Sequence, residues 1–177
     1  GIIIATGSRP VEIPGFKYDG KQIISAKEGV SLNPLPKRLL IIGGGIIGME
    51  LGGVYSKLGI DTTVVEFLPK VLATMDDDLV NVVTKAMGKS GCKFITGAKA
   101  QGYEKNADGS LKVTLDVGGN VQKIDTDVVL VAVGMRPNHE GNGFEKIGLA
   151  QDKRGHVVIN DRFETNVKGV YAIGDVA

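Results

Sequence analysis

The chain has 177 residues, which suffices for one sizeable hydrophobic core or for one domain with flanking pieces. Its 42% hydrophobic and 23% charged content is ordinary for a soluble globular protein, and a formal net charge of +1 without a basic block argues against nucleic acid or an anionic membrane as a partner. No apolar run is long enough to cross a membrane. Cys92 is the only cysteine, so we expect a buried thiol without a disulfide, metal or redox role.

In chain order, the first half predicts alternating strands and helices, which is the pattern of an α/β fold with a parallel sheet. Ser25 is placed to cap a short helix, and Gly59 is placed to end a longer one. The predicted strands are 2–6, 23–24, 38–42 and 62–66, and the predicted helices are 25–30, 45–58 and 76–89.

The predicted strand 38–42 is followed by the pattern G-x-G-x-x-G, formed by Gly43, Gly45 and Gly48. Gly43 permits a sharp turn off the strand, Gly45 lets backbone N–H groups approach a pyrophosphate, and Gly48 lets the helix pack closely on the sheet. The N-terminus of the helix then directs unpaired N–H donors and its positive dipole end at the phosphates. This order indicates a dinucleotide site; the alternative is a tight turn that binds nothing.

Glu66 follows the next predicted strand, eighteen residues after Gly48. A carboxylate at this position accepts hydrogen bonds from both ribose hydroxyls of an adenosine and repels a 2′-phosphate. No arginine stands among residues 67–70 to pair with such a phosphate. These features favour NAD over NADP.

Three acids, Asp76, Asp77 and Asp78, open the helix that ends near Lys89. In a first turn, carboxylates lie beside unpaired backbone N–H groups, where negative charge is favourable. We therefore expect these acids to stabilise the helix; the alternative, a metal site, is not predicted.

Between 93 and 133 the sequence changes to short strands separated by glycine turns, at Asp108-Gly109 and Gly118-Gly119. We expect a β-meander over one face of the sheet, followed by a continuous apolar strand that ends at Gly134, where a ligand can meet the backbone. Residues 139–147 are predicted to be a polar loop. The predicted strands are 93–96, 98–105, 111–117, 121–124, 127–133, 156–159 and 170–173.

The chain begins and ends within apolar strands, and its first residue is Gly1 rather than methionine. Chain termini usually lie at exposed surfaces. We therefore expect this chain to be an internal piece of a longer protein.

Four motifs stand in order: Ala5-Thr-Gly7, the glycine pattern with Glu66, Ala132-Val-Gly-Met-Arg-Pro137 and Tyr171-Ala-Ile-Gly-Asp175. Over essentially the whole chain this order resembles the FAD- and NAD(P)-dependent disulfide oxidoreductases, and within them most closely the dihydrolipoamide dehydrogenases. The resemblance implies an α/β fold with a Rossmann-like parallel sheet, a meander and the flanking strands of a discontinuous FAD domain. It places an NAD-binding domain at 37–138 and FAD-domain segments at 1–36 and 139–177.

The resemblance also implies roles for single residues. Glu50 matches a glutamate that contacts the nicotinamide amide, Ile46 matches a side chain that shields the flavin, and Asp175 matches an acceptor for a ribityl hydroxyl. The structural alternatives are helix packing for Ile46, a solvated charge for Glu50 and a helix cap for Asp175. The residues expected at NAD are Gly43, Gly45, Ile46, Ile47, Gly48, Glu50, Glu66 and Gly134, and those expected at FAD are Ala5, Thr6, Gly7, Gly174 and Asp175.

By the same resemblance, the longer protein would oxidise a dihydrolipoyl dithiol and pass a hydride from reduced flavin to NAD. The family's redox cysteines and acid/base histidine would lie outside this chain, so we expect no catalytic residue here and an inactive fragment. The alternatives are a related flavin NADH oxidase or ferredoxin reductase, and a stand-alone nucleotide-binding module. Expected partners are the dihydrolipoyl domain of a 2-oxo acid dehydrogenase complex and a second subunit of a homodimer, inside the cell: in the mitochondrial matrix if eukaryotic, or the cytoplasm if bacterial.

Overall fold

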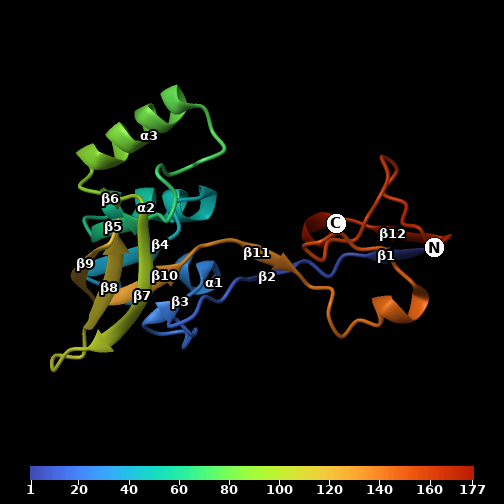
Figure 1. Cartoon of the computed structure of the whole chain (residues 1–177), viewed down its shortest axis with the longest axis horizontal. Helices are drawn as coiled ribbons and strands as arrows, with labels where there is room; N and C mark the ends of the chain where they lie inside the picture. Colours follow the sequence, from blue (N-terminus) through green and yellow to red (C-terminus); the bar gives the residue numbers. More distant parts are fainter. The chain divides into compact units, whose positions relative to one another are not determined.

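A computed structural model describes all 177 residues of the chain (Figure 1). The chain forms two compact units, each built from its own contacts. Unit 1 combines Gly1–Val11 with Met135–Ala177, and unit 2 is Glu12–Gly134. No helix is long and apolar enough to cross a membrane.

The centre of unit 2 is a five-stranded sheet in the order β3-β10-β4-β5-β6, in which every neighbouring pair is parallel. Strands buried on both faces need apolar residues at nearly every position, and β4 (Arg-Leu-Leu-Ile-Ile) and β10 (Val-Val-Leu-Val) have them. The strands are β3 (Ile23–Ile24), β4 (Arg38–Ile42), β5 (Asp61–Val65), β6 (Lys93–Ile95) and β10 (Val128–Val131). The predicted parallel α/β sheet is therefore confirmed.

Helices cover one face of this sheet. They are α1 (Ala26–Gly29), α2 (Ile46–Lys57) and α3 (Asp77–Lys89). Leu39, Ile41 and Val64 of the sheet share a core with Met49 of α2 and Met87 of α3. In Figure 1, α2 lies between α3 and the sheet.

The antiparallel sheet β7-β8-β9 covers the other face, as the predicted meander requires. Leu111 and Val113 of β8 share a core with Leu40 and Val129 of the parallel sheet. The strands are β7 (Ala98–Lys105), β8 (Leu111–Val117) and β9 (Asn120–Thr126). One expectation was wrong: strand 93–96 does not begin the meander, because β6 pairs with β5 and completes the parallel sheet.

Unit 1 contains two pairs of short strands. β1 (Ile2–Ile4) is parallel to β12 (Val170–Ala172), and β2 (Ser8–Pro10) is antiparallel to β11 (Met135–Pro137). Two predictions need correction. A 3-10 helix, η1 (Phe144–Ile147), ends the predicted loop 139–147, and residues 156–159 form no strand, since Val157 makes only an isolated bridge to Gln151. The second 3-10 helix, η2, is Gly174–Val176.

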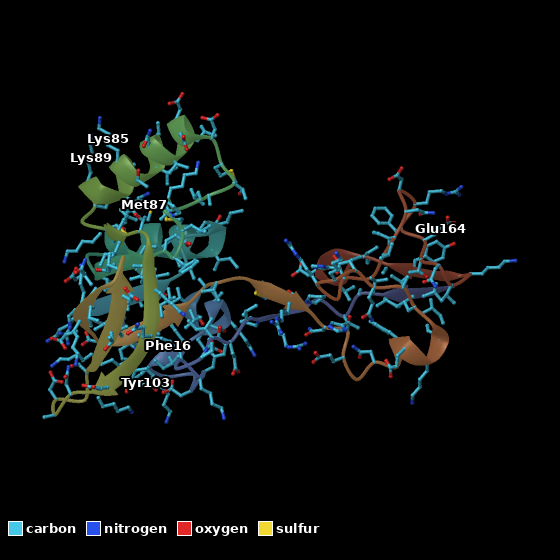
Figure 2. The ribbon with its side chains drawn as sticks, in the orientation of Figure 1. Phe16, Lys85, Met87, Lys89, Tyr103 and Glu164 are labelled. Carbon is cyan, nitrogen blue, oxygen red and sulfur yellow. The ribbon has the colours of Figure 1, made fainter.

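Residues 12–36 belong to unit 2, whereas the sequence analysis grouped them with the first residues of the chain. The reason is packing that the sequence pattern does not reveal. β3 completes an edge of the parallel sheet, and the fully buried ring of Phe16 lies 5.8 Å, centroid to centroid, from that of Tyr103 on β7 (Figure 2). The contact boundary therefore falls near residue 12, and the cofactor assigned to each segment remains a prediction.

Candidate functional site

The turn between β4 and α2 is shaped by close backbone packing. Gly43 has φ of +111°, which side chains rarely adopt, and a Cβ there would overlap the carbonyl oxygen of Ala132 at the end of β10. A Cβ at Gly48 would overlap the carbonyl oxygen of Gly43, so the first turn of α2 can lie this close to β4 only with glycine. These overlaps supply a steric reason for the first and third glycines of the pattern.

Gly45 differs from these two glycines. It has no positive φ, and a Cβ at Gly45 would meet no atom of the protein within 4 Å. Its missing side chain therefore leaves open space at the surface of the turn instead of relieving an internal clash. Such space is what a ligand needs in order to approach the backbone.

The N-terminus of α2 has no side-chain cap. Gly45 occupies the N-cap, and the first turn contains no acid. By contrast, Ser25 caps α1 and Asp76 caps α3 through side-chain oxygens that accept backbone N–H bonds. The first N–H groups of α2 are thus left for another acceptor, where the helix dipole favours negative charge.

Glu66 follows β5 and reaches across to the glycine turn. Its Oε2 accepts a hydrogen bond of 2.6 Å from the N–H of Gly44, and its Oε1 accepts one of 2.8 Å from the N–H of Leu68. Both oxygens therefore hold backbone at the carboxyl edge of the sheet. Each carboxylate oxygen has a second lone pair, so the same group can accept further hydrogen bonds from a ligand.

These features meet in a cleft of about 1140 Å³ in unit 2. It lies beyond the carboxyl ends of parallel strands, which is where α/β sheets bind their ligands. Most of the predicted NAD residues line it, but Gly48 and Glu50 do not: Gly48 is buried beneath the turn, and Glu50 lies exposed on α2. The predicted residues in the lining are Gly43, Gly45, Ile46, Ile47, Glu66 and Gly134.

Apolar side chains stand around the cleft with much of their surface exposed. The exposed fractions are 56% for Ile46, 68% for Phe67 and 39% for Val133. A group of large apolar side chains that are solvent-exposed around one concavity usually marks a binding site. The cleft therefore offers apolar walls for flat ring systems beside polar backbone for charged groups.

Part of the lining comes from residues without a sequence motif. Residues 98–101 of β7 and the pair Ile13 and Pro14 also line the cleft, and Lys99 brings a cation to it. No local motif marks these residues, because the meander and the 12–36 segment reach the cleft only through tertiary packing. The sequence of β7 predicts a strand, but it does not predict that this strand lies beside the cleft.

In unit 1, the residues predicted to bind FAD come from the two ends of the chain. β1 and β12 are parallel, so Ala5, Thr6 and Gly7 emerge at the same edge as Gly174 and Asp175. The Ser8 hydroxyl donates a hydrogen bond of 2.7 Å to Oδ2 of Asp175. Asp175 is exposed, so its carboxylate has room for another donor.

A comparison with protein families matches residues 1–177 to the pyridine nucleotide-disulphide oxidoreductase family. The chain belongs to this family. Its curated relatives include a dihydrolipoyl dehydrogenase of Thermus scotoductus, 46% identical over 99% of the chain, and a leghemoglobin reductase of Glycine max, 43% identical over 99%. The chain spans only 38% and 34% of the lengths of these two proteins.

Solved structures of this oxidoreductase family share the fold. LpdA of Mycobacterium tuberculosis superposes with a TM-score of 0.88 at 27% identity, over 99% of this chain and 37% of that one. The HOCl-induced flavoprotein disulfide reductase RclA of Escherichia coli gives a TM-score of 0.85 at 26% identity, over 99% and 39%. The expected disulfide oxidoreductase fold is therefore confirmed.

Two titratable groups of the chain have structural roles outside the cleft. Burial opposes ionisation of Asp127, but hydrogen bonds from the Arg38 guanidinium and from the backbone N–H groups of Arg38 and Lys37 hold its pKa below the usual value. Cys92 is 5% exposed, as predicted for a buried thiol, and burial raises its pKa to about 11.

Proposed function

We propose that unit 2 binds NAD in the cleft at the carboxyl edge of its parallel sheet. The observation that carries the proposal is the meeting of three features in one concavity. These are the uncapped N-terminus of α2, the open space at Gly45 and the carboxylate of Glu66. Each alone has a structural explanation, but together they offer donors for a pyrophosphate and an acceptor for a ribose.

The pyrophosphate would lie against the backbone between Gly45 and Ile47. Backbone N–H groups bind phosphate oxygens well only at close approach, which the space at Gly45 permits. The helix dipole adds a favourable field in the same direction. Lys99, which lines the same cleft, supplies the one cationic side chain of the lining.

Glu66 would bind the adenosine ribose while keeping its two backbone hydrogen bonds. Its free lone pairs accept the ribose hydroxyls, and its charge disfavours a 2′-phosphate. Phe67 and Leu68 follow directly and line the cleft, so they provide an apolar surface for the adenine ring. Ile46 and Val133, which also line the cleft, would contact the nicotinamide half of NAD.

Unit 1 would hold part of an FAD. Its support is the shared edge of β1 and β12, which brings Thr6, Gly7 and Asp175 together, and the exposed carboxylate of Asp175. Asp175 would accept a flavin hydroxyl, with Ser8 orienting its carboxylate. The longer protein would then be a flavoenzyme that uses both cofactors.

We propose that this longer protein is a dihydrolipoyl dehydrogenase that passes a hydride from reduced flavin to NAD. Relatives with that name, from Thermus scotoductus and Trypanosoma brucei brucei, support this. Two relatives are named leghemoglobin reductases, which favours a related flavin reductase as the second candidate. This chain supplies binding and orientation, and the cofactors carry the electrons.

The proposed partners and location follow from the proposed dihydrolipoyl dehydrogenase activity. They are a dihydrolipoyl domain of a 2-oxo acid dehydrogenase complex, a second subunit, and the mitochondrial matrix or bacterial cytoplasm. One relative, from Pisum sativum, is named as mitochondrial. A pull-down of the longer protein with a lipoylated domain, set against its unlipoylated form, tests the partner.

The cofactor proposal is tested by titrating the chain with NADH and following nicotinamide fluorescence. Gly45→Val should weaken binding by at least about 10-fold, because the new side chain fills the space that the phosphates need. Gly88→Val is the matched control, since Gly88 also has no neighbour within 4 Å but lies on α3, outside the cleft. Equal affinities for the two variants would refute the proposed phosphate position.

A further inference from the structure

Helix α3 has one broad apolar surface, and only part of it is packed. Val80 and Met87 are each 7% exposed and face the core, and in Figure 2 Met87 points from α3 toward α2. Beside this packed part, Leu79, Val82 and Val83 continue the apolar surface of the helix, and they are 61%, 68% and 37% exposed.

We call Leu79, Val82, Val83 and Ala86 the outer stripe. Their spacing of three, four and seven residues places them on one side of a helix. An apolar stripe of this kind is the pattern of a helix face that packs against another element. All 177 residues are described, and no segment of the chain covers this stripe.

The charges beside the outer stripe are arranged by sign. At 100° per residue, Asp78, Lys85 and Lys89 fall along the same edge of the stripe, with the acid at the N-terminal end and the two lysines at the C-terminal end. None of the three forms an ion pair within the chain. Figure 2 shows Lys85 and Lys89 on the side of α3 away from Met87.

We propose that the outer stripe is a self-association surface, on which α3 of a second copy packs antiparallel. A two-fold axis between Val82 and Val83 brings the same edge of both helices together. Asp78 then lies opposite the stretch between Lys85 and Lys89 of the other copy, and the same contact occurs twice. A parallel two-fold pair would instead put the charged edges of the two helices on opposite sides of the contact, where Asp78 meets neither lysine, so the charges favour the antiparallel arrangement.

The size of the surface sets the strength of the contact. One helix of 13 residues buries much less than the roughly 1,600 Å² of a stable protein–protein interface. The association is therefore weak, with a dissociation constant on the order of 10 µM to 1 mM. The apolar stripe supplies the attraction, and the rim charges fix the direction.

Sedimentation equilibrium of the 177-residue chain, from about 10 µM to about 1 mM, measures this dimer. Val82→Glu should weaken it by at least about 10-fold, because a charge is buried at the two-fold axis. Val121→Glu is the matched control: Val121 is 66% exposed on β9, far from α3 in sequence and outside the stripe. Circular dichroism verifies that both variants are folded.

A charge exchange tests the antiparallel direction. Asp78→Lys alone, or Lys85→Asp with Lys89→Asp, places like charges opposite each other and should weaken association by about 3- to 30-fold. An equimolar mixture of the two variants restores both contacts and should recover the wild-type affinity. The proposal is overturned if the chain stays monomeric at all concentrations, if the two glutamate substitutions have equal effects, or if the mixture does not recover the affinity. Binding of a different protein to the outer stripe, in place of a second copy, would also overturn it.

Discussion

The carboxylate of Glu66 and the backbone N–H of Gly44 are joined by a hydrogen bond of 2.6 Å. This bond links the end of β5 to the glycine turn after β4, so the residue proposed to recognise ribose also supports the turn proposed to bind phosphate. A substitution of Glu66 therefore acts on both parts of the cleft. A test of its specificity role must separate the two effects.

We expect Glu66→Gln to shift the preference between cofactors toward NADPH. Both cofactors need the same phosphate turn, so damage to the turn lowers both affinities alike and cancels in their ratio. The lost charge acts only on the 2′-phosphate, and its repulsion of about 1–4 kcal/mol at ~4 Å corresponds to a ratio change of about 5- to 10³-fold. Titration of NADH and NADPH against both proteins measures that ratio.

Asp61→Asn is the matched control for this experiment. Asp61 begins β5, whereas Glu66 follows the end of that strand. The carboxylate of Asp61 pairs with Lys93, outside the cleft. Its removal should leave the cofactor ratio unchanged. An unchanged ratio in Glu66→Gln as well would assign Glu66 to the support of the turn alone.

We expect Gly48→Ala and Gly88→Ala to change stability in opposite directions. The new Cβ at position 48 would overlap the backbone carbonyl of Gly43, which no side-chain rotation can relieve, so α2 must move away from β4 at a cost of about 1–3 kcal/mol. At position 88 the Cβ meets nothing, and helix propensity gives a gain of up to about 1 kcal/mol. Urea unfolding of both variants compares them, and a neutral Gly48→Ala would contradict the close approach.

The sequence predicts the parallel half of unit 2 well, because its signals are local. Strand 38–42 matches β4 at both ends, and the helix opened by Asp76 matches α3. Hydrophobic runs, glycine turns and caps are properties of neighbouring residues, so they can be interpreted without knowing what packs against them.

Tertiary pairing was the source of the errors. β6 has the composition of a meander strand, but it joins β5, and β3 is too short to show that it completes the sheet beside β10. The same limit applies to the cleft: Lys99 reaches it through the fold of β7, and Glu50 of α2 is not in its lining, so the predicted role of Glu50 at the nicotinamide stays a prediction. Neither result follows from spacing along the chain.

We expect the Arg38–Asp127 pair to stabilise the chain above the ordinary range of carboxyl titration. The folded-state pKa of Asp127 is lowered, so its contribution is fully present above the unfolded value of about 3.9 and is lost as the pH falls through the lower folded value. Asp127→Asn should therefore be less stable at neutral pH, with a difference from wild type that shrinks below about pH 4.

Many acids titrate in this pH range, so the measurement is the difference between the unfolding free energies of wild type and variant. Glu104→Gln serves as the control, because Glu104 forms only an exposed ion pair of 3.8 Å with Lys123. Its effect should stay within about 0.5 kcal/mol at every pH. A difference for Asp127→Asn that is constant from neutral pH to pH 3 would show that its charge is not the cause.

Cys92 should resist thiol reagents while the chain is folded. Reaction requires the thiolate, and a pKa of about 11 leaves about 0.1% in that form at pH 8, compared with about a quarter for an ordinary thiol with a pKa of about 8.5. Burial blocks access as well, since the side chain packs in the core beneath α3. We therefore expect labelling by an aromatic disulfide at pH 8 to be at least about 100-fold slower than in guanidinium chloride, where the pKa returns to its ordinary value. Because the residual rate reports opening of the core, Gly48→Ala should accelerate labelling by about 10-fold for each 1.4 kcal/mol of lost stability. Rapid labelling of the folded wild type would contradict the buried setting of Cys92.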